Sequence, residues 1–537
     1  MPLRAAKRAS VQESAVLFLL LASIITVAVI AKRLRIPYPI AFVIAGSLLA
    51  FIPNVPRFEL NPEIVFLIFL PPLLYAGGWM TDWESFKAAL RPIVLLSISL
   101  VIVTTGVVGL AAHALLPQLG WAAAFVLGAI VSPPDAVAAG AVFERFSVPR
   151  RILTILDGEG LVNDASDLVI YNFGIAAVLS GSFSIAHASV AFVFVAAGGV
   201  VLGLAFGFVI LKLMLLLRKL ELSDYLIDNA IQLFAPYAIY VSCQSIGVSG
   251  VLATVTAGVF MSRQAGKIYL PEGRLVAYAV WDLLIFLLNG LVFLLIGLQL
   301  RSIVSDPAFA LRELWIGLAI SAIVIAVRIA WVYPSTYLPR LLFRRIRESE
   351  TFPAPEYVFI VAWSGMRGIV SLAAALALPL ATNSGAPFPG RAEILFVTFC
   401  VIFVTLVFQG LSLIPLLKIL HIEAGESLED REMEARIAAL SAGIARLRKL
   451  EPTFDSTEEW EVEGRILGEY EYRIAHLSGH LDGSIGPQEI AFDHRMQAEA
   501  LSAERAEILR LRDGGEIPDE VYRKIQYDLD LADERLS

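Results

Sequence analysis

The amino-acid sequence predicts an all-α polytopic membrane protein with about 13 transmembrane helices and a helical soluble tail. Of its 537 residues, 57% are hydrophobic and only 17% are charged, whereas about a quarter of the residues of a soluble globular protein are charged. The hydrophobic residues gather in runs long enough to cross a bilayer. Loops rich in Lys and Arg alternate with loops that have few of them, as is typical of a protein that crosses the membrane many times. This composition excludes a disordered chain and disfavours an ordinary soluble enzyme.

Each expected span is a run of mainly apolar residues, of which a membrane helix needs roughly 20. The eighth and ninth runs touch at Gly247–Gly250, so their boundary is the least distinct. The runs lie near residues 14–32, 38–54, 61–80, 90–116, 120–143, 150–180, 187–217, 224–247, 249–264, 276–300, 310–338, 356–380 and 391–419.

Positive charge predicts the orientation of these spans. The odd-numbered loops contain 18 Lys and Arg residues, whereas the even-numbered loops contain 4, namely Arg57, Arg301, Arg312 and Arg391. Because basic loops stay on the cytoplasmic side, the odd loops and the C-terminal tail are expected to be cytoplasmic. Thirteen crossings then place the N-terminus outside, in a multi-pass protein of the cell membrane, which we expect to be a bacterial inner membrane.

The tail differs from the membrane part in charge. Residues 421–537 contain 14 basic and 28 acidic residues, and residues 1–420 contain 28 and 22. In the tail, Ile437, Leu440, Ile444 and Leu447 recur at helical spacing, and the segment Gly483–Pro487 divides it into two helical parts. We expect a cytoplasmic helical domain, which is either simply solvated or a regulatory or dimer-stabilising module.

Several classes of function are disfavoured. Neither part presents the dense basic face that nucleic-acid binding requires. The two cysteines, Cys243 and Cys400, lie in apolar runs and form neither a disulfide scaffold nor a metal site. No phosphate-binding glycine loop, HExxH motif or nucleophile elbow is present, which argues against an ATP-driven pump and the common hydrolases. We therefore expect no enzymatic activity and no cofactor.

The densest group of membrane-depth acids lies in the sixth span, between Asp157 and Asp167. Ionisable residues at this depth are costly and indicate function by default. Glu159, Asn163 and Asp167 are spaced by four and share one helical face, whereas Asp164 lies about 100° round from Asn163. The alternative is a polar seam that only joins neighbouring helices.

Two other spans are interrupted. In the fifth, Ser132-Pro133-Pro134-Asp135 breaks the backbone ladder, because two prolines remove two donors. In the twelfth, Gly365 and Gly368 flank a lone arginine, Arg367. The two spans are seven crossings apart and run in opposite directions. Interrupted helices at corresponding places in two halves are typical of an inverted-repeat transporter with a midplane ion site; a simple proline kink and a close-packed glycine interface are the alternatives.

One further arginine, Arg328, lies in the middle of the eleventh span and needs a buried anion. Glu159 is its natural partner. Arg367 is the only other arginine at comparable depth, so it is the second candidate for that pairing.

Five segments in order resemble the monovalent cation–proton antiporters, specifically the bacterial NhaP-type sodium/proton exchangers. Gly158–Asp164 is similar to the family's sixth-helix signature, and Ser132–Ala138 is similar to its fifth-helix break. The other three matching segments are Leu70–Tyr75, Ser249–Ala253 and Gly365–Leu372. The resemblance spans residues 14 to about 420.

This resemblance implies a fold of thirteen helices in which the two interrupted helices cross near the midplane, and an exchanger that is a homodimer. It implies that Asp164 binds the transported Na⁺ or proton beside Asn163, that Asp135 lies at the crossing, that Glu159 pairs with a buried arginine and that Arg367 is the family's twelfth-helix arginine. Within residues 1–420 it implies a dimer domain (14–80 and 224–300) and a core ion-transport domain (90–180 and 310–419) that moves against it.

The sequence departs from the family pattern near these residues. Pro134 and Ala136 flank Asp135 where relatives often have Thr and Pro, so a hydroxyl ligand is missing. Ala76-Gly77-Gly78 stands where many relatives have an acid, and Asp167 is an extra acid. These differences leave the reaction class intact but bear on ligand detail and on Na⁺/K⁺ preference.

The expected function is exchange of Na⁺ or Li⁺ for H⁺ across the lipid bilayer by alternating access; K⁺/H⁺ exchange is the same-class alternative. Asp164 would hold either a cation or a proton, and hard oxygen ligands suit such a cation. Because Asn163 replaces a second carboxylate, we expect electroneutral exchange. An intramembrane protease with Asp135 and Asp164 as its dyad and an ion sensor with the tail as its output are rival hypotheses.

Overall fold

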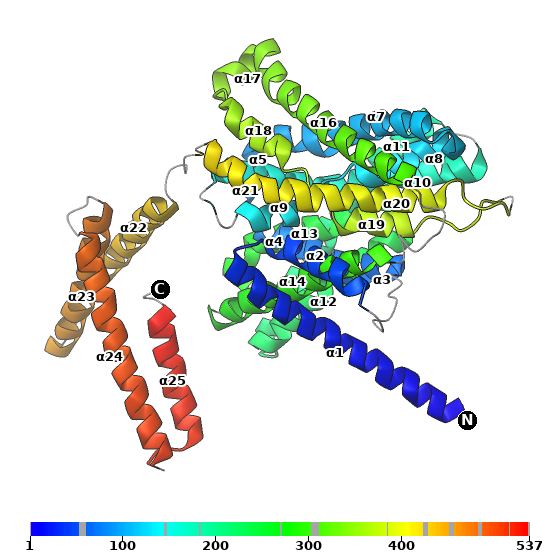
Figure 1. The fold of residues 1–537 in the computed structure, drawn as a ribbon. Helices are drawn as coiled ribbons and strands as arrows, with labels where there is room; N and C mark the ends of the chain where they lie inside the picture. The colour runs from blue at the N-terminus through cyan, green and yellow to red at the C-terminus, as the bar shows by residue number, and fades with distance from the viewer. Residues whose placement is uncertain are drawn as a thin grey trace. The chain divides into compact units, whose positions relative to one another are not determined.

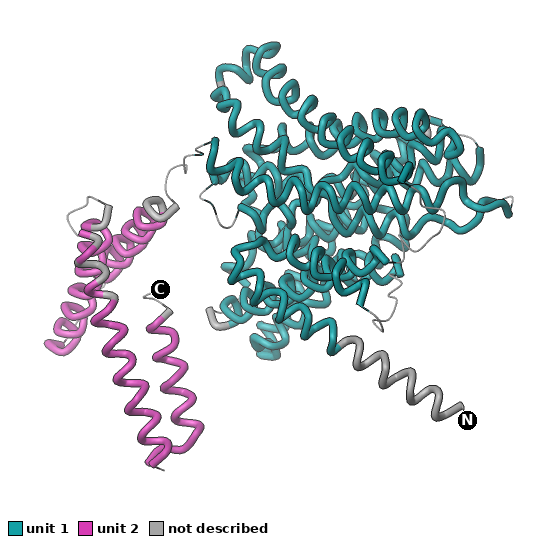
Figure 2. Tube along the Cα trace, viewed as in Figure 1, with its two compact units in different colours: residues 1–423 teal, residues 424–537 magenta. Residues whose placement is uncertain are grey.

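Helices form nearly all of the described chain (Figure 1). The structure is a computed structural model, which describes residues 2–52, 61–143, 146, 148–181, 184–268, 271–301, 311–383, 385–420, 422, 428–449, 456–481, 486–514 and 516–534. Within these residues, an isolated antiparallel bridge pairs Ala381 with Pro387. Contacts along the chain divide it into two units, residues 1–423 and 424–537 (Figure 2).

The first half of the larger unit contains both long and interrupted helices. Its long helix α10 contains the acidic segment. The elements are α1 (Pro2–Leu34), α2 (Tyr38–Ala50), α3 (Pro62–Ile64), α4 (Leu70–Met80), α5 (Trp83–Ala88), α6 (Leu90–Val94), α7 (Val101–Leu115), α8 (Gly120–Val131), α9 (Ala136–Phe143) and α10 (Arg150–Ser180).

The second half of the larger unit also contains both long and interrupted helices. The expected boundary between the eighth and ninth spans is a turn at Gly247, which ends α12 in the left-handed conformation (φ 84°) that glycine adopts without steric cost. The elements are α11 (Ile185–Lys219), α12 (Tyr225–Ile246), α13 (Gly250–Ile268), α14 (Pro271–Leu298), α16 (Leu311–Leu342), α17 (Arg344–Ser349), α18 (Pro355–Trp363), α19 (Ile369–Leu376), α20 (Arg391–Phe403) and α21 (Gly410–Ile419).

Three of the expected spans continue through a π-helical stretch instead of breaking. Val65–Phe69 joins α3 to α4, Leu95–Leu100 joins α6 to α7, and Val404–Gln409 joins α20 to α21. The fifth span does break, between α8 and α9, and the twelfth breaks between α18 and α19. Local π stretches often occur at functional sites, and the one at 404–409 packs beside the break in the twelfth span.

An all-helical membrane architecture is confirmed. Among the described residues, 7 helical segments are long and apolar enough to cross a membrane by length and composition. Helix α10, which contains the acidic segment, is not among them. The full count of 13 crossings stays a prediction, as does the orientation. Arg57 and Arg145, which entered the loop count, lie outside the described residues.

Close helix packing in the larger unit depends on small residues. A Cβ at Gly46 in α2 would strike the backbone of α14 at Leu294, and a Cβ at Gly297 in α14 would strike α2 at Val43. The two backbones therefore touch, as is common where membrane helices associate without a hydrophobic driving force. Helices α4 and α13 meet in the same way, since a Cβ at Gly78 would lie 2.5 Å from the Val255 oxygen.

Three helix ends are joined by one carboxylate. Arg91 of α6, Arg151 of α10 and Arg340 of α16 all reach Oε2 of Glu350, just after α17, at 2.9, 3.3 and 2.7 Å. The Arg340 side chain is only 5% exposed, whereas that of Glu350 is 23% exposed. Since three guanidinium groups would otherwise repel one another, Glu350 holds this end of the unit together.

The described part of the smaller unit contains four helices: α22 (Leu428–Arg448), α23 (Thr457–Leu481), α24 (Pro487–Asp513) and α25 (Asp519–Glu534). Helix α22 packs on α23 and α24 packs on α25. The expected break before Pro487 is present, but each part is itself a helix pair. Gly514 and Pro518 lie between α24 and α25 and end the helix there, because neither residue favours a helix interior. Residues 482–485 of the expected break lie outside the described residues.

We expect Glu350→Gln to destabilise the larger unit, because it leaves three arginines facing one another without a carboxylate. The expected loss is about 1–3 kcal/mol, below the value for a fully buried pair, since Glu350 is partly exposed. Thermal melting of the detergent-solubilised protein measures this loss. Glu348→Gln, which removes an exposed pair with Arg344, is the control. Equal melting temperatures of the two variants would contradict a stabilising role for the Glu350 contacts.

Candidate ion-binding site

The two broken helices meet at their breaks. The backbone N–H of Asp135 donates to the carbonyl of Met366 over 2.6 Å. Pro133 and Pro134 leave backbone carbonyls without helical partners, and the Asp135 side chain accepts a hydrogen bond at 2.9 Å from the N–H of Val137, in the first turn of α9. The structure therefore brings both interrupted segments to one point inside the larger unit.

Glycine makes this meeting sterically feasible. A Cβ at Gly368 would overlap the carboxylate of Asp135, and a Cβ at Gly365 would overlap the side chain of Arg328. The two glycines that flank Arg367 thus admit a carboxylate on one side and a guanidinium on the other. The sequence singled out both positions, but it did not indicate which groups would occupy the space beside them.

Arg367 binds backbone carbonyls around the breaks. Its side chain is buried, with Nε donating to the Val131 carbonyl at 3.1 Å and Nη1 donating to the Gly365 carbonyl. Val131 is the last residue of α8, so the guanidinium lies where a helix presents its negative end and a cation is favoured. The backbone N–H of Arg367 donates to the Thr405 hydroxyl at 3.0 Å.

Arg328 and Glu159 form a buried ion pair. Nη1 and Nη2 of Arg328 lie 2.5 and 2.8 Å from Oε1 and Oε2 of Glu159, and the two side chains are 0% and 1% exposed. Nη2 also donates to the Val361 carbonyl at 3.1 Å. This bidentate geometry is the strong form of the arginine–carboxylate interaction. It ties α10 to α16 and α18, and it leaves Glu159 no role as a free acid.

Asn163 and Asp164 differ in their surroundings. Asn163 is fully buried, and its Nδ2 donates to the Pro134 carbonyl at 2.8 Å, so it provides a partner for a carbonyl in the break between α8 and α9. Asp164 is partly exposed and has no hydrogen-bond or ion-pair partner among the described residues. It lies close enough to Asp135 for the two carboxylates to interact electrostatically.

Asp167 lies on the same α10 face as Asn163, one turn further along. It is fully buried, and its Oδ1 lies 3.3 Å from the hydroxyl of Ser132, at the end of α8. The structure thus gathers all of the predicted site residues around the two breaks: Asp164, Asn163, Asp135, Glu159, Arg328, Arg367, Ser132, Pro133, Pro134, Gly365 and Gly368.

Two polar residues of this region were missed by sequence reasoning. Thr405 accepts from the backbone of Arg367, and Gln409 donates to the Trp363 carbonyl at the end of α18 over 3.1 Å. Both are fully buried and stand four residues apart in an apolar span. That spacing puts them on one helix face and would have marked a polar stripe toward the break.

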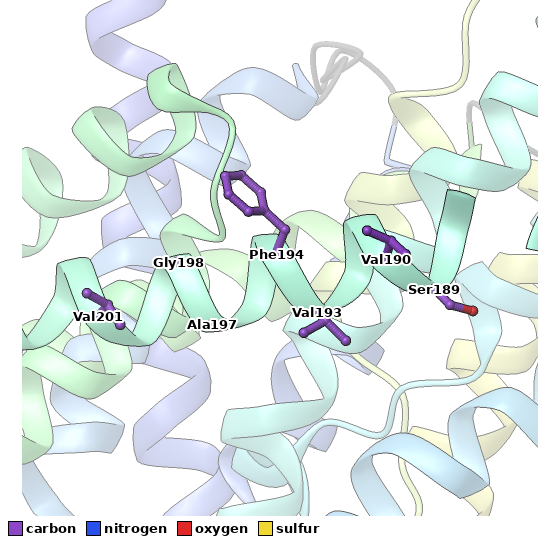
Figure 3. A pocket seen from close by; sticks show the side chains of 7 residues that line it. All are labelled: Ser189, Val190, Val193, Phe194, Ala197, Gly198 and Val201. Atoms are coloured by element: carbon purple, nitrogen blue, oxygen red, sulfur yellow. The ribbon is translucent and has the colours of Figure 1, made fainter. Parts of the chain in front are cut away.

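The acids of the site do not line the surface hollow on α11. A shallow apolar hollow lies over α11, along Val190, Val193, Phe194 and Val201 (Figure 3), and it contains none of the acids. In the described part of the chain, no group of three or more His, Cys, Asp or Glu residues is arranged to hold a metal ion. The breaks bring together two partly exposed carboxylates, Asp135 and Asp164, and the buried carboxylate of Asp167, and such oxygen donors suit a hard cation or a proton.

Comparisons with known proteins agree on one family. The model of the family described as "Sodium/hydrogen exchanger, transmembrane" matches residues 17–419. A sodium, potassium, lithium and rubidium/H⁺ antiporter of Bacillus subtilis is 32% identical over 517 residues, covering 95% of this chain and 76% of that protein. A low-affinity Na⁺/H⁺ antiporter of Synechocystis is 30% identical over 457 residues, covering 82% of each.

The fold also matches a solved structure. The sodium proton antiporter MjNhaP1 of Methanocaldococcus jannaschii, at pH 8, superposes with a TM-score of 0.57 and 18% sequence identity. The match covers 76% of this chain and 99% of that one. At this identity the likeness supports the fold and no detail of the site.

We expect the Glu159–Arg328 pair to show strong coupling in a double-mutant cycle. Glu159→Leu alone leaves a buried guanidinium without its carboxylate, which costs about 3–5 kcal/mol in soluble proteins. The double variant Glu159→Leu with Arg328→Met removes both charges and should restore much of the lost stability. Thermal melting in detergent measures the stability of each variant, and cation-driven proton flux in vesicles measures its transport. Additive losses would show that the pair is not energetically linked.

We expect Gly368→Ala to disrupt the crossing, because the added methyl group would occupy the position of the Asp135 carboxylate. Transport should fall at least about tenfold, as small displacements at a reacting centre commonly cause. Gly140→Ala is the matched control: Gly140 lies in α9, just beyond the same break, and a Cβ there would meet nothing within 4 Å. A Gly368→Ala protein with wild-type transport would contradict this tight approach.

Proposed function

The chain belongs to the transmembrane sodium/hydrogen exchanger family, and from this premise we propose that Asp164 is the carboxylate that binds either Na⁺ (or Li⁺) or a proton. The observation that supports this assignment is the difference between Asp164 and its neighbours. Glu159 is neutralised by Arg328 and Asn163 is held by Pro134, whereas Asp164 has no partner among the described residues.

Exchange follows from the unpaired carboxylate of Asp164. A cation and a proton neutralise the same charge, so binding of one displaces the other. If only the neutralised site moves across the membrane, each cycle replaces one ion by the other. Asn163 adds an oxygen without adding a charge, so we propose that the exchange is electroneutral. The released backbone carbonyls at the break can supply further oxygen ligands.

Asp135 and Arg367 are proposed to hold the site without carrying its exchanged ion. Asp135 caps the first turn of α9, where a helix N-terminus stabilises negative charge. Arg367 binds the carbonyl at the end of α8, where positive charge is stabilised. The fixed charges thus match the ends of the half-helices, and Asp135 adds an oxygen ligand for the cation.

We propose that the core domain (90–180 and 310–419) moves against a dimer domain (14–80 and 224–300). Packing supports this division: α2 packs on α14 and α4 on α13, whereas α7 and α10 pack on α8 and α16 packs on α20. Alternating access would then carry Asp164 between the two sides. A homodimer is part of the proposal, and molecular-mass measurement in detergent tests it. Protease accessibility of the tail in inverted membrane vesicles tests the proposed cytoplasmic location of residues 421–537.

The transported cation is proposed to be Na⁺ or Li⁺, with K⁺ as the second candidate. The relative from Bacillus subtilis is named for sodium, potassium, lithium and rubidium, and Pro134 stands here where a hydroxyl ligand is common. Dissipation of an acid-inside gradient in vesicles by Na⁺, Li⁺, K⁺ or choline would separate the candidates. Choline, which is too large for the site, is the negative control.

We expect Asp164→Asn to abolish exchange while the protein still folds, because asparagine carries neither the charge that balances Na⁺ nor an exchangeable proton. Cation-driven proton flux in vesicles is the measurement, and gel filtration and thermal melting verify folding. Asp157→Asn, which changes a more exposed acid on the same helix, should retain flux. Cation-driven flux through a well-folded Asp164→Asn protein would refute the assignment.

A further inference from the structure

Asp167 is a buried acid whose charge has no fixed partner. Its side chain is fully buried, its Oδ2 has no hydrogen-bond partner, and no Lys or Arg pairs with it among the described residues. Glu159, two turns earlier on the same face, is equally buried but is neutralised by Arg328. A buried carboxylate without compensation is strongly disfavoured. Asp167 must therefore carry a proton or a bound cation.

The Ser132 side chain, which contacts Asp167, cannot neutralise it. The Ser132 hydroxyl lies 3.3 Å from Oδ1 of Asp167 and 3.0 Å from the Ala129 carbonyl. A hydroxyl has a single hydrogen to donate, and the carbonyl can only accept. Whichever acceptor takes that hydrogen, at least one carboxylate oxygen remains open. Two oxygens of Asp167, the Ser132 oxygen and the carbonyl beside it are the hard donors that a small monovalent cation prefers.

The position of Asp167 places it next to the exchange site. It follows Asp164 by three residues, an axial rise of about 4.5 Å, on neighbouring parts of the helix surface. Ser132, which contacts Asp167, stands two residues before Pro134, which contacts Asn163. Beyond Asp167, Tyr171 donates to the Ala374 carbonyl, and Arg391 donates to the carbonyls of Leu376 and Leu378.

Asp164 and Asp167 differ in solvent exposure along the axis of α10. Asp164 is partly exposed, whereas Asp167, one turn nearer the Gly181 end of α10, is fully buried. Asp167 and its contact Ser132 are both buried, and Asp167 lies on the Gly181 side of Asp164.

We propose that Asp167, with Ser132, is a second cation station on the route between Asp164 and the side of the membrane that faces the Gly181 end of α10. The proposal rests on the exchange function proposed above. A proton neutralises Asp167 when the station is closed. A monovalent cation that passes it displaces that proton, so each station replaces one ion by the other and the overall exchange stays one for one.

The test uses Asp167→Asn, because asparagine has the shape of a protonated aspartate but cannot bear its charge. Oriented proteoliposomes of the full chain allow the KM and kcat for Na⁺ to be measured from each side. We expect the KM to rise about tenfold, which corresponds to 1.4 kcal/mol, on the side facing the Gly181 end only. Asp157→Asn is the control on the same helix and should leave both values unchanged.

Each other outcome overturns the proposal. An unchanged KM on both sides would show that Asp167 acts as a permanently neutral acid. A similar rise on both sides would show that the substitution disturbs Asp164 itself. If Asp167→Asn fails to fold, Ser132→Ala, which keeps every charge, must raise the KM on the same single side; an unchanged KM there refutes the station.

Failure of the proposed function would look different. If the wild-type protein shows no cation-driven proton flux, or if Asp164→Asn retains it, the exchange site itself is wrong. Wild-type flux that depends on Asp164, together with an indifferent Asp167→Asn, would reject only the second station.

Discussion

The arrangement of the site depends on the contact between two broken helices, made by the Asp135 N–H and the Met366 carbonyl. A continuous helix satisfies its own backbone and offers nothing to an ion. Once Pro133 and Pro134 open the ladder, backbone groups in the membrane must find partners inside the protein. Met366, Asn163 and Arg367 supply those partners. The break is therefore stable only because the second break lies against it.

Charge compensation explains why so many ionisable residues are tolerated there. Glu159 and Arg328 neutralise each other, and Arg367 lies at the end of α8. Asp135 caps α9. Two carboxylates, Asp164 and Asp167, have no fixed counter-charge among the described residues. In this region the paired charges hold the helices together, and the two unpaired carboxylates are those to which we assign the mobile ions.

The remainder of the larger unit keeps this region in place by close packing. Glycines bring α2 against α14 and α4 against α13, so these pairs are rigid neighbours. At one end, Glu350 ties α6, α10 and α16 through three arginines. The glycine contacts lie within the proposed dimer domain, whereas the Glu350 contacts lie within the proposed core domain, so each proposed domain has its own internal ties.

The sequence by itself determined the class of fold, the interrupted spans and the identity of the polar residues at membrane depth. These properties are local: a run of apolar residues, a pair of prolines or an acid in an apolar helix has the same physical consequence wherever the helix packs. The family resemblance, carried by short motifs, was equally accessible and is confirmed by the comparisons.

Only the tertiary structure decided which group lies against which. Arg328 and Arg367 both lie in the middle of predicted spans, but Arg328 meets Glu159 whereas Arg367 meets backbone carbonyls, because Arg328 lies within α16 and Arg367 lies in the break between α18 and α19. For the same reason the sequence did not place Ser132 beside Asp167. Hydrogen-bond partners several helices apart depend on distances of a few ångströms, which residue spacing along one helix does not specify.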